Sequence, residues 1–121
     1  MTLPTEKQVA DILVSRGVPS RLVDGGAAGL LAAWAAFVEQ AEVGYSFGLD
    51  DYRNDLDLRS LICLTGLDAA AVNEDARFRN LLTRTDLEVW SSDAPGAWWT
   101  FGYPANSGSD LLEDLRAEGI L

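Results

Sequence analysis

The strongest constraint on the fold is an apolar stripe that follows the period of an α-helix between residues 30 and 45. Its members are Leu30, Trp34, Phe37, Val38, Ala41 and Tyr45. Residues with this spacing share one face of a helix. Alanines occupy much of the remaining surface, and such small side chains let neighbouring helices approach closely. We therefore predict a central helix on which the rest of the chain packs.

Four further helices are predicted from similar patterns. Thr5 and Gln8 have the spacing of a capping box, the reciprocal side chain–backbone hydrogen bonding that opens many helices. Further along, Tyr52 and Leu56 share the apolar face of a segment that ends before Gly66, and we expect both in the core. The four helices are expected near residues 5–16, 49–64, 73–82 and 109–119.

A glycine-rich turn precedes the central helix. Residues 24–29 read Asp-Gly-Gly-Ala-Ala-Gly, a composition found where helix N-termini bind anions. The turn lacks the Lys and the Ser or Thr of a phosphate loop, and no predicted strand precedes it. We therefore interpret it as a turn that allows close packing.

The periodicity changes after Thr83. Residues 85–91 and 97–103 alternate between the two faces of an extended chain, as strands do. The residues between them, Ser-Asp-Ala-Pro-Gly, are typical of a turn. We therefore predict a single α+β domain over residues 1–121. It is mostly helical, with about five helices, and has one C-terminal antiparallel β-hairpin packed on the helices.

The charge balance limits the kinds of partner. Nineteen Asp and Glu residues face nine Lys and Arg residues, and without His the net charge is −10. This charge repels phosphate backbones and anionic membranes, so we expect neither nucleic acid nor membrane as a partner. The longest apolar run, residues 27–38, is shorter than the ~20 residues that span a bilayer. The N-terminus lacks the pattern of a signal peptide. We expect a cytoplasmic monomer or homodimer that meets a basic partner.

The sequence offers few groups for catalysis. Without His, neither a Ser-His-Asp triad nor a Cys-His dyad nor a His-ligated zinc site can form. Cys63, the only cysteine, lies in an apolar stretch with no adjacent cation, so we expect its thiol to stay protonated. We predict no catalytic residue, no cofactor and no metal.

The densest polar cluster lies in the predicted helix over residues 49–64. Its spacing does not match a calcium loop, which needs ligands at alternating positions and a glycine at the sixth. On a helix, residues four apart are neighbours. We therefore predict surface ion pairs between Arg53 and Asp57 and between Asp55 and Arg59.

The same cluster supplies a predicted protein-binding surface, together with tryptophans of the predicted hairpin. Strand alternation would put consecutive tryptophans on opposite faces, so we expect one of them outside the core. An exposed Trp is typical of an interaction hot spot, and surface acids steer a basic partner. The predicted protein-binding residues are Asp50, Asp51, Asp55, Asp57, Trp98 and Trp99.

The run from Asp51 to Arg59, with Phe78 and the later Trp-Trp-Thr-Phe segment, resembles a group of small acidic bacterial proteins of uncharacterised function. The shared core is Asp-Tyr-x-Asn-Asp-Leu-Asp-x-Arg, and the likeness covers the later two-thirds of the chain. The resemblance implies a bacterial origin. It brings no activity, cofactor or catalytic residue with it.

Three functions are compatible with these features. The first is a non-enzymatic protein-binding domain, in the manner of an immunity or antitoxin protein that neutralises a basic partner. The second is a small carboxylate- or metal-dependent enzyme that uses the aspartates at positions 50–57. The third is a regulatory or adaptor module that forms a homodimer. Small size, negative charge and the Trp-rich hairpin favour the first.

Overall fold

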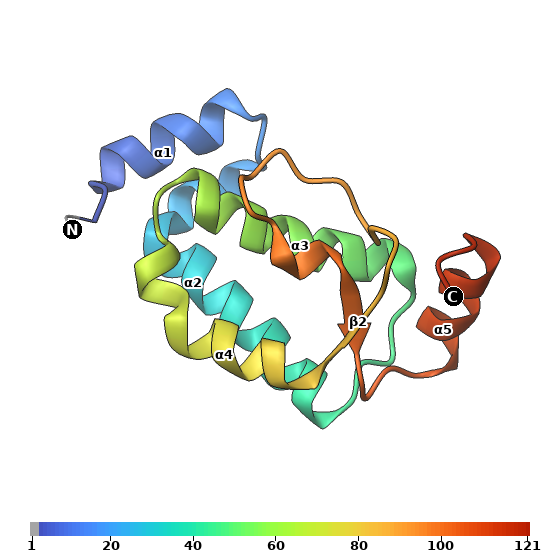
Figure 1. The fold of residues 1–121 in the computed structure, drawn as a ribbon. Coiled ribbons are helices and arrows are strands. Elements are labelled where there is room, and N and C mark those ends of the chain that lie inside the picture. The colour runs from blue at the N-terminus through green and yellow to red at the C-terminus, as the bar shows by residue number, and fades with distance from the viewer. Residues whose placement is uncertain (1–2) are drawn as a thin grey trace.

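The computed structural model describes residues 3–121 and confirms a mostly helical α+β fold (Figure 1). Two short strands near the C-terminus form an antiparallel sheet. In chain order the elements are α1 (Glu6–Ser15), α2 (Ser20–Val43), α3 (Leu49–Leu64), the 3-10 helix η1 (Asp68–Ala71), α4 (Val72–Leu81), β1 (Leu82–Arg84), the 3-10 turn η2 (Trp98–Thr100), β2 (Gly102–Pro104) and α5 (Ser109–Ala117).

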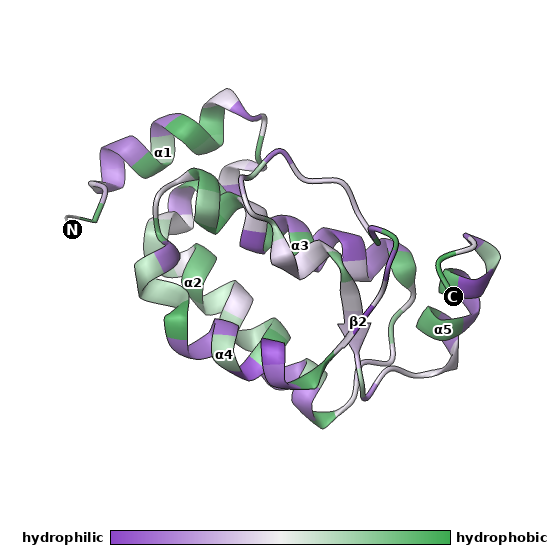
Figure 2. Cartoon of the chain, viewed as in Figure 1, coloured by the Kyte–Doolittle hydropathy of each residue, from purple (hydrophilic) through white to green (hydrophobic). Residues whose placement is uncertain are grey.

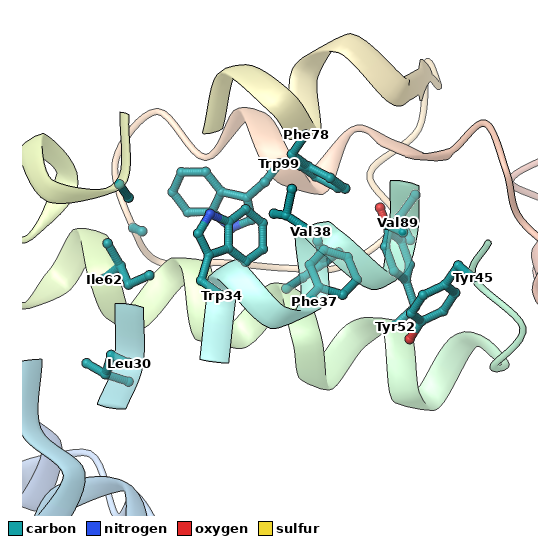
Figure 3. Packing of buried hydrophobic residues seen from close by; sticks show 14 of the residues in the cluster. Leu30, Trp34, Phe37, Val38, Tyr45, Tyr52, Ile62, Phe78, Val89 and Trp99 are labelled. Atoms are coloured by element: carbon teal, nitrogen blue, oxygen red, sulfur yellow. The ribbon is translucent and has the colours of Figure 1, made fainter. Parts of the chain in front are cut away.

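The predicted apolar stripe is buried and places α2 at the centre of the fold. Helices α1, α3 and α4 all pack against α2, and hydrophilic residues are spread along α3 and α4 beside the largely hydrophobic α2 (Figure 2). Figure 3 shows the aromatic side chains that meet in the core. Phe37 lies at its middle, with ring centroids 5.2 Å from Trp34, 5.4 Å from Phe78 and 5.7 Å from Tyr45. The sequence prediction of this core is confirmed.

By length and mean hydropathy alone, α2 is also long and apolar enough to cross a membrane. The central helix of a helical domain meets the same test, because it must be apolar to pack against its neighbours in the core. The apolar stripe of α2, with Leu30, Trp34 and Phe37, is buried against the other helices. This packing accounts for the stripe, whereas 28% of the residues in the most apolar window of α2 are buried in all.

Helix α2 contains a kink at Gly26, within the glycine-rich turn. Gly26 has φ 62° and ψ −154°, a conformation that is essentially restricted to glycine. Beyond it the helix restarts, and Glu6 Oε2 accepts a hydrogen bond from the Ala27 N–H at 3.4 Å. The turn therefore holds a carboxylate of the chain itself. A carboxylate at a helix N-terminus is stabilising, because the helix dipole is positive there.

Replacing Gly26 by Ala should destabilise the fold. The added Cβ would collide with Glu6 Oε2, and the backbone conformation would be strained. We expect Gly26→Ala to lower the free energy of unfolding by about 2 kcal/mol. The matched control is Gly25→Ala, whose Cβ would have no neighbour within 4 Å and should cost nothing or stabilise by up to ~1 kcal/mol. Urea denaturation measures both, and equal stabilities would contradict the role of the kink.

A buried ion pair joins the three central helices. Arg59 of α3 is 3% exposed and donates two hydrogen bonds to Asp75 of α4, at 2.8 and 2.9 Å. Trp34 Nε1 of α2 donates to the same carboxylate at 3.1 Å. Arg59 Nη2 also lies 2.8 Å from Asp68 Oδ1. The prediction of a surface pair between Arg59 and Asp55 is therefore wrong: Arg59 points into the core, where a carboxylate sixteen residues further along the chain meets it.

Removing the charge of Asp75 should strongly destabilise the protein. Asp75→Asn leaves the buried Arg59 guanidinium with the more exposed Asp68 as its remaining counter-charge, so we expect a loss of about 3 kcal/mol, the lower end for a broken buried pair. The control is Glu42→Gln, which removes the carboxylate that pairs with Arg77 on the exposed surface and should change stability only slightly. Thermal and urea unfolding compare the two variants. Similar losses would show that the buried pair contributes no more than a surface pair.

The C-terminal strands are shorter than predicted and shifted in the sequence. Strand β1 pairs with β2 so that Thr83 lies opposite Tyr103. The predicted strand at 85–91 is wrong in position, and the one at 97–103 overlaps β2 only at residues 102–103, because residues 85–101 form a long loop across α3 (Figure 1). Within the loop, η2 turns Trp99 towards α3, where its Nε1 donates to Ser60 Oγ at 3.1 Å. Burial of this side chain outweighs the alternation of the sequence.

Candidate functional site

A groove runs along the outward face of α3. Its floor is the stripe Asn54, Leu58 and Leu61, which recurs at helical spacing. One wall is the connection between α1 and α2 with the first turn of α2, residues 16–22, and the other is residues 91–93 of the long loop. The groove has a volume of about 1250 Å³. Its apolar lining residues are Val18, Pro19, Leu22, Ala33, Leu58, Leu61 and Leu64.

Two of the predicted aspartates line this groove. Asp55 accepts a hydrogen bond from the Tyr45 hydroxyl at 2.7 Å, and Asp57 accepts one from Trp90 Nε1 at 2.7 Å. Residues two apart on an α-helix lie about 200° apart around its axis. The two carboxylates therefore flank the Asn54–Leu58 stripe on opposite sides, each fixed by a neutral donor.

Neither carboxylate has a cationic partner within the described residues. The predicted pair of Arg53 with Asp57 is wrong, because Arg53 Nε donates to the Val89 carbonyl at 3.1 Å. The Arg53 guanidinium stacks 4.9 Å from the Trp90 ring and pairs with Glu118, the residue that follows α5. Since Arg59 points into the core, both arginines expected to neutralise the groove aspartates are engaged elsewhere.

The surroundings shift the titration of both groups. Burial raises the pKa of Asp55 above its ordinary value, and the hydrogen bond from Tyr45 offsets only part of that effect. Burial likewise raises the pKa of Asp57, against the lowering effect of the Trp90 hydrogen bond. Each carboxylate is thus less stable in its charged form than a solvated one. An external cation would relieve this penalty.

The loop wall of the groove is held in place by polar contacts. Ser92 Oγ lies 2.8 Å from Ser60 Oγ of α3, and it accepts a hydrogen bond from the Ala94 N–H at 3.2 Å. Arg16 Nη2 pairs with Asp93 Oδ2 at 2.9 Å, and this ion pair joins the two walls. The groove is therefore built from segments that are far apart in the sequence but fixed to one another.

The other two predicted aspartates lie outside the groove. Asp50 lines a small cleft between the first turn of α3 and α5, beside Asp114 and Glu118. In this cleft Asp114 Oδ2 accepts a hydrogen bond from the Leu49 N–H at 3.0 Å and so caps α3. Asp51 is exposed on the same turn. The acidic cluster predicted as one surface is thus divided between two.

The predicted tryptophans do not line the groove. Trp99 is 1% exposed, lies under the Arg59 guanidinium at 4.6 Å, and is inaccessible to a partner. Trp98 is half-buried and packs on α4, where Arg79 stacks over its ring at 4.0 Å and Phe78 lies 6.0 Å away. The two rings therefore differ in exposure, as predicted, but they lie in the 3-10 turn η2 and not in a strand.

Cys63 is half-buried on α3, with its Sγ 3.9 Å from the Pro95 carbonyl oxygen. Burial, and then the nearby Asp68 carboxylate, raises the pKa of its thiol. This agrees with the expectation of a protonated thiol. Within residues 3–121, no group of three His, Cys, Asp or Glu side chains is arranged to hold a metal ion.

Sequence reasoning missed the two donors that fix the groove carboxylates. The sequence identifies Tyr45 only as the end of the apolar stripe, and it is indeed buried, but its hydroxyl reaches a carboxylate ten residues away. Trp90 falls within the strand predicted at residues 85–91. Nothing in a local pattern indicates such contacts, because they depend on how a turn or loop folds back on α3.

Comparison of the chain with protein-family models, with curated proteins and with solved structures gives no match. The resemblance of the run from Asp51 to Arg59 to small acidic bacterial proteins therefore stays a prediction. The groove has to be interpreted from its own chemistry.

The two groove aspartates should make stability depend on pH. Because their pKa values are raised in the folded state, the folded protein binds protons more tightly than the unfolded chain. Their contribution to the free energy of unfolding should therefore increase as the pH falls from neutral through the raised pKa towards the ordinary value of 3.8. Urea denaturation of the wild type and of Asp55→Asn/Asp57→Asn at several pH values measures the contribution of the two aspartates to the free energy of unfolding.

We expect the double variant to lose part of the stabilisation on acidification. Tyr45→Phe should shift the window to higher pH, because it removes the hydrogen bond that lowers the pKa of Asp55. Identical pH profiles for all three proteins would contradict the assignment of strained carboxylates to the groove.

Proposed function

We propose that this chain is a non-enzymatic protein-binding domain that neutralises a basic protein partner, in the manner of an immunity or antitoxin protein, and that it acts in the cytoplasm. The groove along α3 is the proposed binding surface. A partner would place Lys or Arg side chains against Asp55 and Asp57 and apolar side chains on Leu58 and Leu61.

One observation carries the proposal: within the described residues, the two half-buried carboxylates of the groove form no ion pair, although Arg16 and Arg21 of the opposite wall line the same groove. A desolvated charge without a counter-charge destabilises a fold, and natural proteins keep such groups chiefly at functional sites. Here the nearest arginines along the helix, Arg53 and Arg59, are held by other groups. Binding of an external cation would then gain energy that the free protein does not realise.

The overall charge supports a basic partner. Six ion pairs use only a minority of the nineteen acidic side chains, all of which lie within the described residues. The resulting field speeds the encounter with a cationic protein and repels other acidic molecules. It argues against nucleic acid as the ligand, because phosphates would be repelled.

A carboxylate enzyme is the second candidate, since raised pKa values are common among catalytic acids. A mechanism in which one carboxylate is the acid and the other the base or nucleophile needs both groups to reach one reacting centre. Asp55 and Asp57 flank α3 on opposite sides, and each already accepts a hydrogen bond from a fixed donor. This arrangement suits two separate cationic contacts better than a catalytic pair.

The proposal predicts which acids hold the partner and which only attract it. After a pull-down at low salt from the native cells, binding kinetics would be measured with the basic protein recovered. Asp55→Asn/Asp57→Asn should raise Kd at least about tenfold, mostly through faster dissociation, because these carboxylates are half-buried. Asp50→Asn/Asp51→Asn removes the same charge from the exposed turn and should mainly slow association.

Salt provides the second readout. Association of the wild type should slow as ionic strength rises, because exposed charges are screened beyond ~8 Å at physiological salt. Recovery of no basic protein, or kinetics unaffected by both salt and the groove variant, would contradict the proposed function.

A further inference from the structure

We infer that the segment of the partner that occupies the groove is an amphipathic α-helix with Lys or Arg on both sides of an apolar stripe. This inference rests on the proposed function and specifies the ligand of the same groove. It follows from the shape of the floor, the hydrogen bonding of the walls and the placement of the charges.

The floor of the groove is a helix surface with a free ridge. Asn54, Leu58 and Leu61 stand one turn apart on α3, and Leu64 continues the row. Between Asn54 and Leu64 the helix advances about 15 Å. The ridges of one helix pack into the grooves of another. A helix of about three turns therefore matches the length of this floor, and its side chains can pack between those of α3.

The walls favour a helix over an extended peptide. An extended segment binds by pairing its backbone with the free edge of a sheet. The floor of this groove is α3, whose backbone groups are bonded within the helix. The walls are the connection between α1 and α2 with the first turn of α2, and residues 91–93 of the long loop, and neither β1 nor β2 contributes a residue. Because the groove has no strand edge, a helix, which satisfies its own backbone hydrogen bonds, fits it better than an extended segment.

The charges of the groove specify where the cations of the occupant lie. Asp55 and Asp57 flank the floor on opposite sides near its Asn54 end. At the other end, beside Ser60 and Cys63, the loop brings Asp93 to Arg16, and this pair is already neutral. The occupant should therefore carry its cations towards one end, on both sides of the apolar stripe.

A second copy of this chain does not fit these requirements. Within the described residues, no helix carries two cations that are free of intramolecular contacts. The cations of α3 and α4 are engaged by Glu118, Asp75, Glu42 and Trp98. Two copies of net charge −10 would also repel each other. The occupant is therefore a segment of a different, basic protein.

Synthetic peptides of equal length and charge test the secondary structure of the occupant. Three fluorescently labelled peptides of about fourteen residues, built from Leu and Lys with one Pro in the third, would be compared. One has the apolar period of a helix, one alternates Leu and Lys as a strand does, and one has the helical pattern with a central Pro. Fluorescence anisotropy gives Kd for the full-length protein, and circular dichroism reports helix formation on binding.

We expect the helical-pattern peptide to bind at least ~10-fold more tightly than the other two, because only it presents both an apolar stripe and flanking cations. Asp55→Asn/Asp57→Asn should weaken its binding at least ~10-fold. The charge-matched control Asp50→Asn/Asp51→Asn should weaken it less than ~3-fold. Leu58→Ala should weaken it without changing the salt dependence. Circular dichroism of each variant alone verifies that it is folded.

Two results would overturn the inference. Equal binding of the helical and alternating peptides would exclude a helix as the preferred occupant, and equal losses in the groove variant and in its control would exclude the groove as the site. The proposed function fails separately, if no basic protein is recovered from the native cells. If a basic protein is recovered whose binding depends on Asp55 and Asp57 while the helical peptide has no advantage, only the helix is excluded.

Discussion

The ion pair between Arg59 and Asp75 is the contact on which the rest of the structure depends. It links α3 to α4, and Trp34 attaches α2 to the same carboxylate, so three helices meet at one buried charge pair. The guanidinium also supports the long loop, because Trp99 stacks on it. Such a pair does not have to add stability relative to an apolar core, but it penalises every arrangement in which one partner is left alone. It therefore fixes the rotation of α3 relative to its neighbours.

That rotation determines what the outward face of α3 presents. With Arg59 turned inward, Asp55 keeps only the hydroxyl of Tyr45 as a partner. With Arg53 held by the loop, Asp57 keeps only the indole of Trp90. The proposed binding surface is thus a consequence of core packing. The groove and its uncompensated charges arise from the same contacts that close the domain.

The sequence predicts the parts of the fold that depend on local periodicity. The helix expected at residues 49–64 is observed with those bounds, and the buried stripe of α2 follows its predicted spacing. Prediction fails where the partner is distant. The i+4 rule pairs Arg59 with Asp55 because it considers one helix only, whereas the actual partner lies in α4. The alternation at 97–103 predicts a strand because a local pattern contains no information on the burial of Trp99 against α3. The candidate site is predicted only in part for the same reason: its aspartates lie in one helix, but its two walls come from other parts of the chain.

The groove carboxylates are also held more rigidly than surface acids. Their donors, Tyr45 and Trp90, are themselves packed, the first fully buried and the second stacked beneath Arg53. A fixed carboxylate loses little side-chain entropy when a cation binds, whereas an exposed one must be ordered first. Packing of the surrounding core offsets the free-energy cost of desolvating the two carboxylates. A partner at the proposed binding surface would therefore meet carboxylates that are already held in place and that form no ion pair within the described residues.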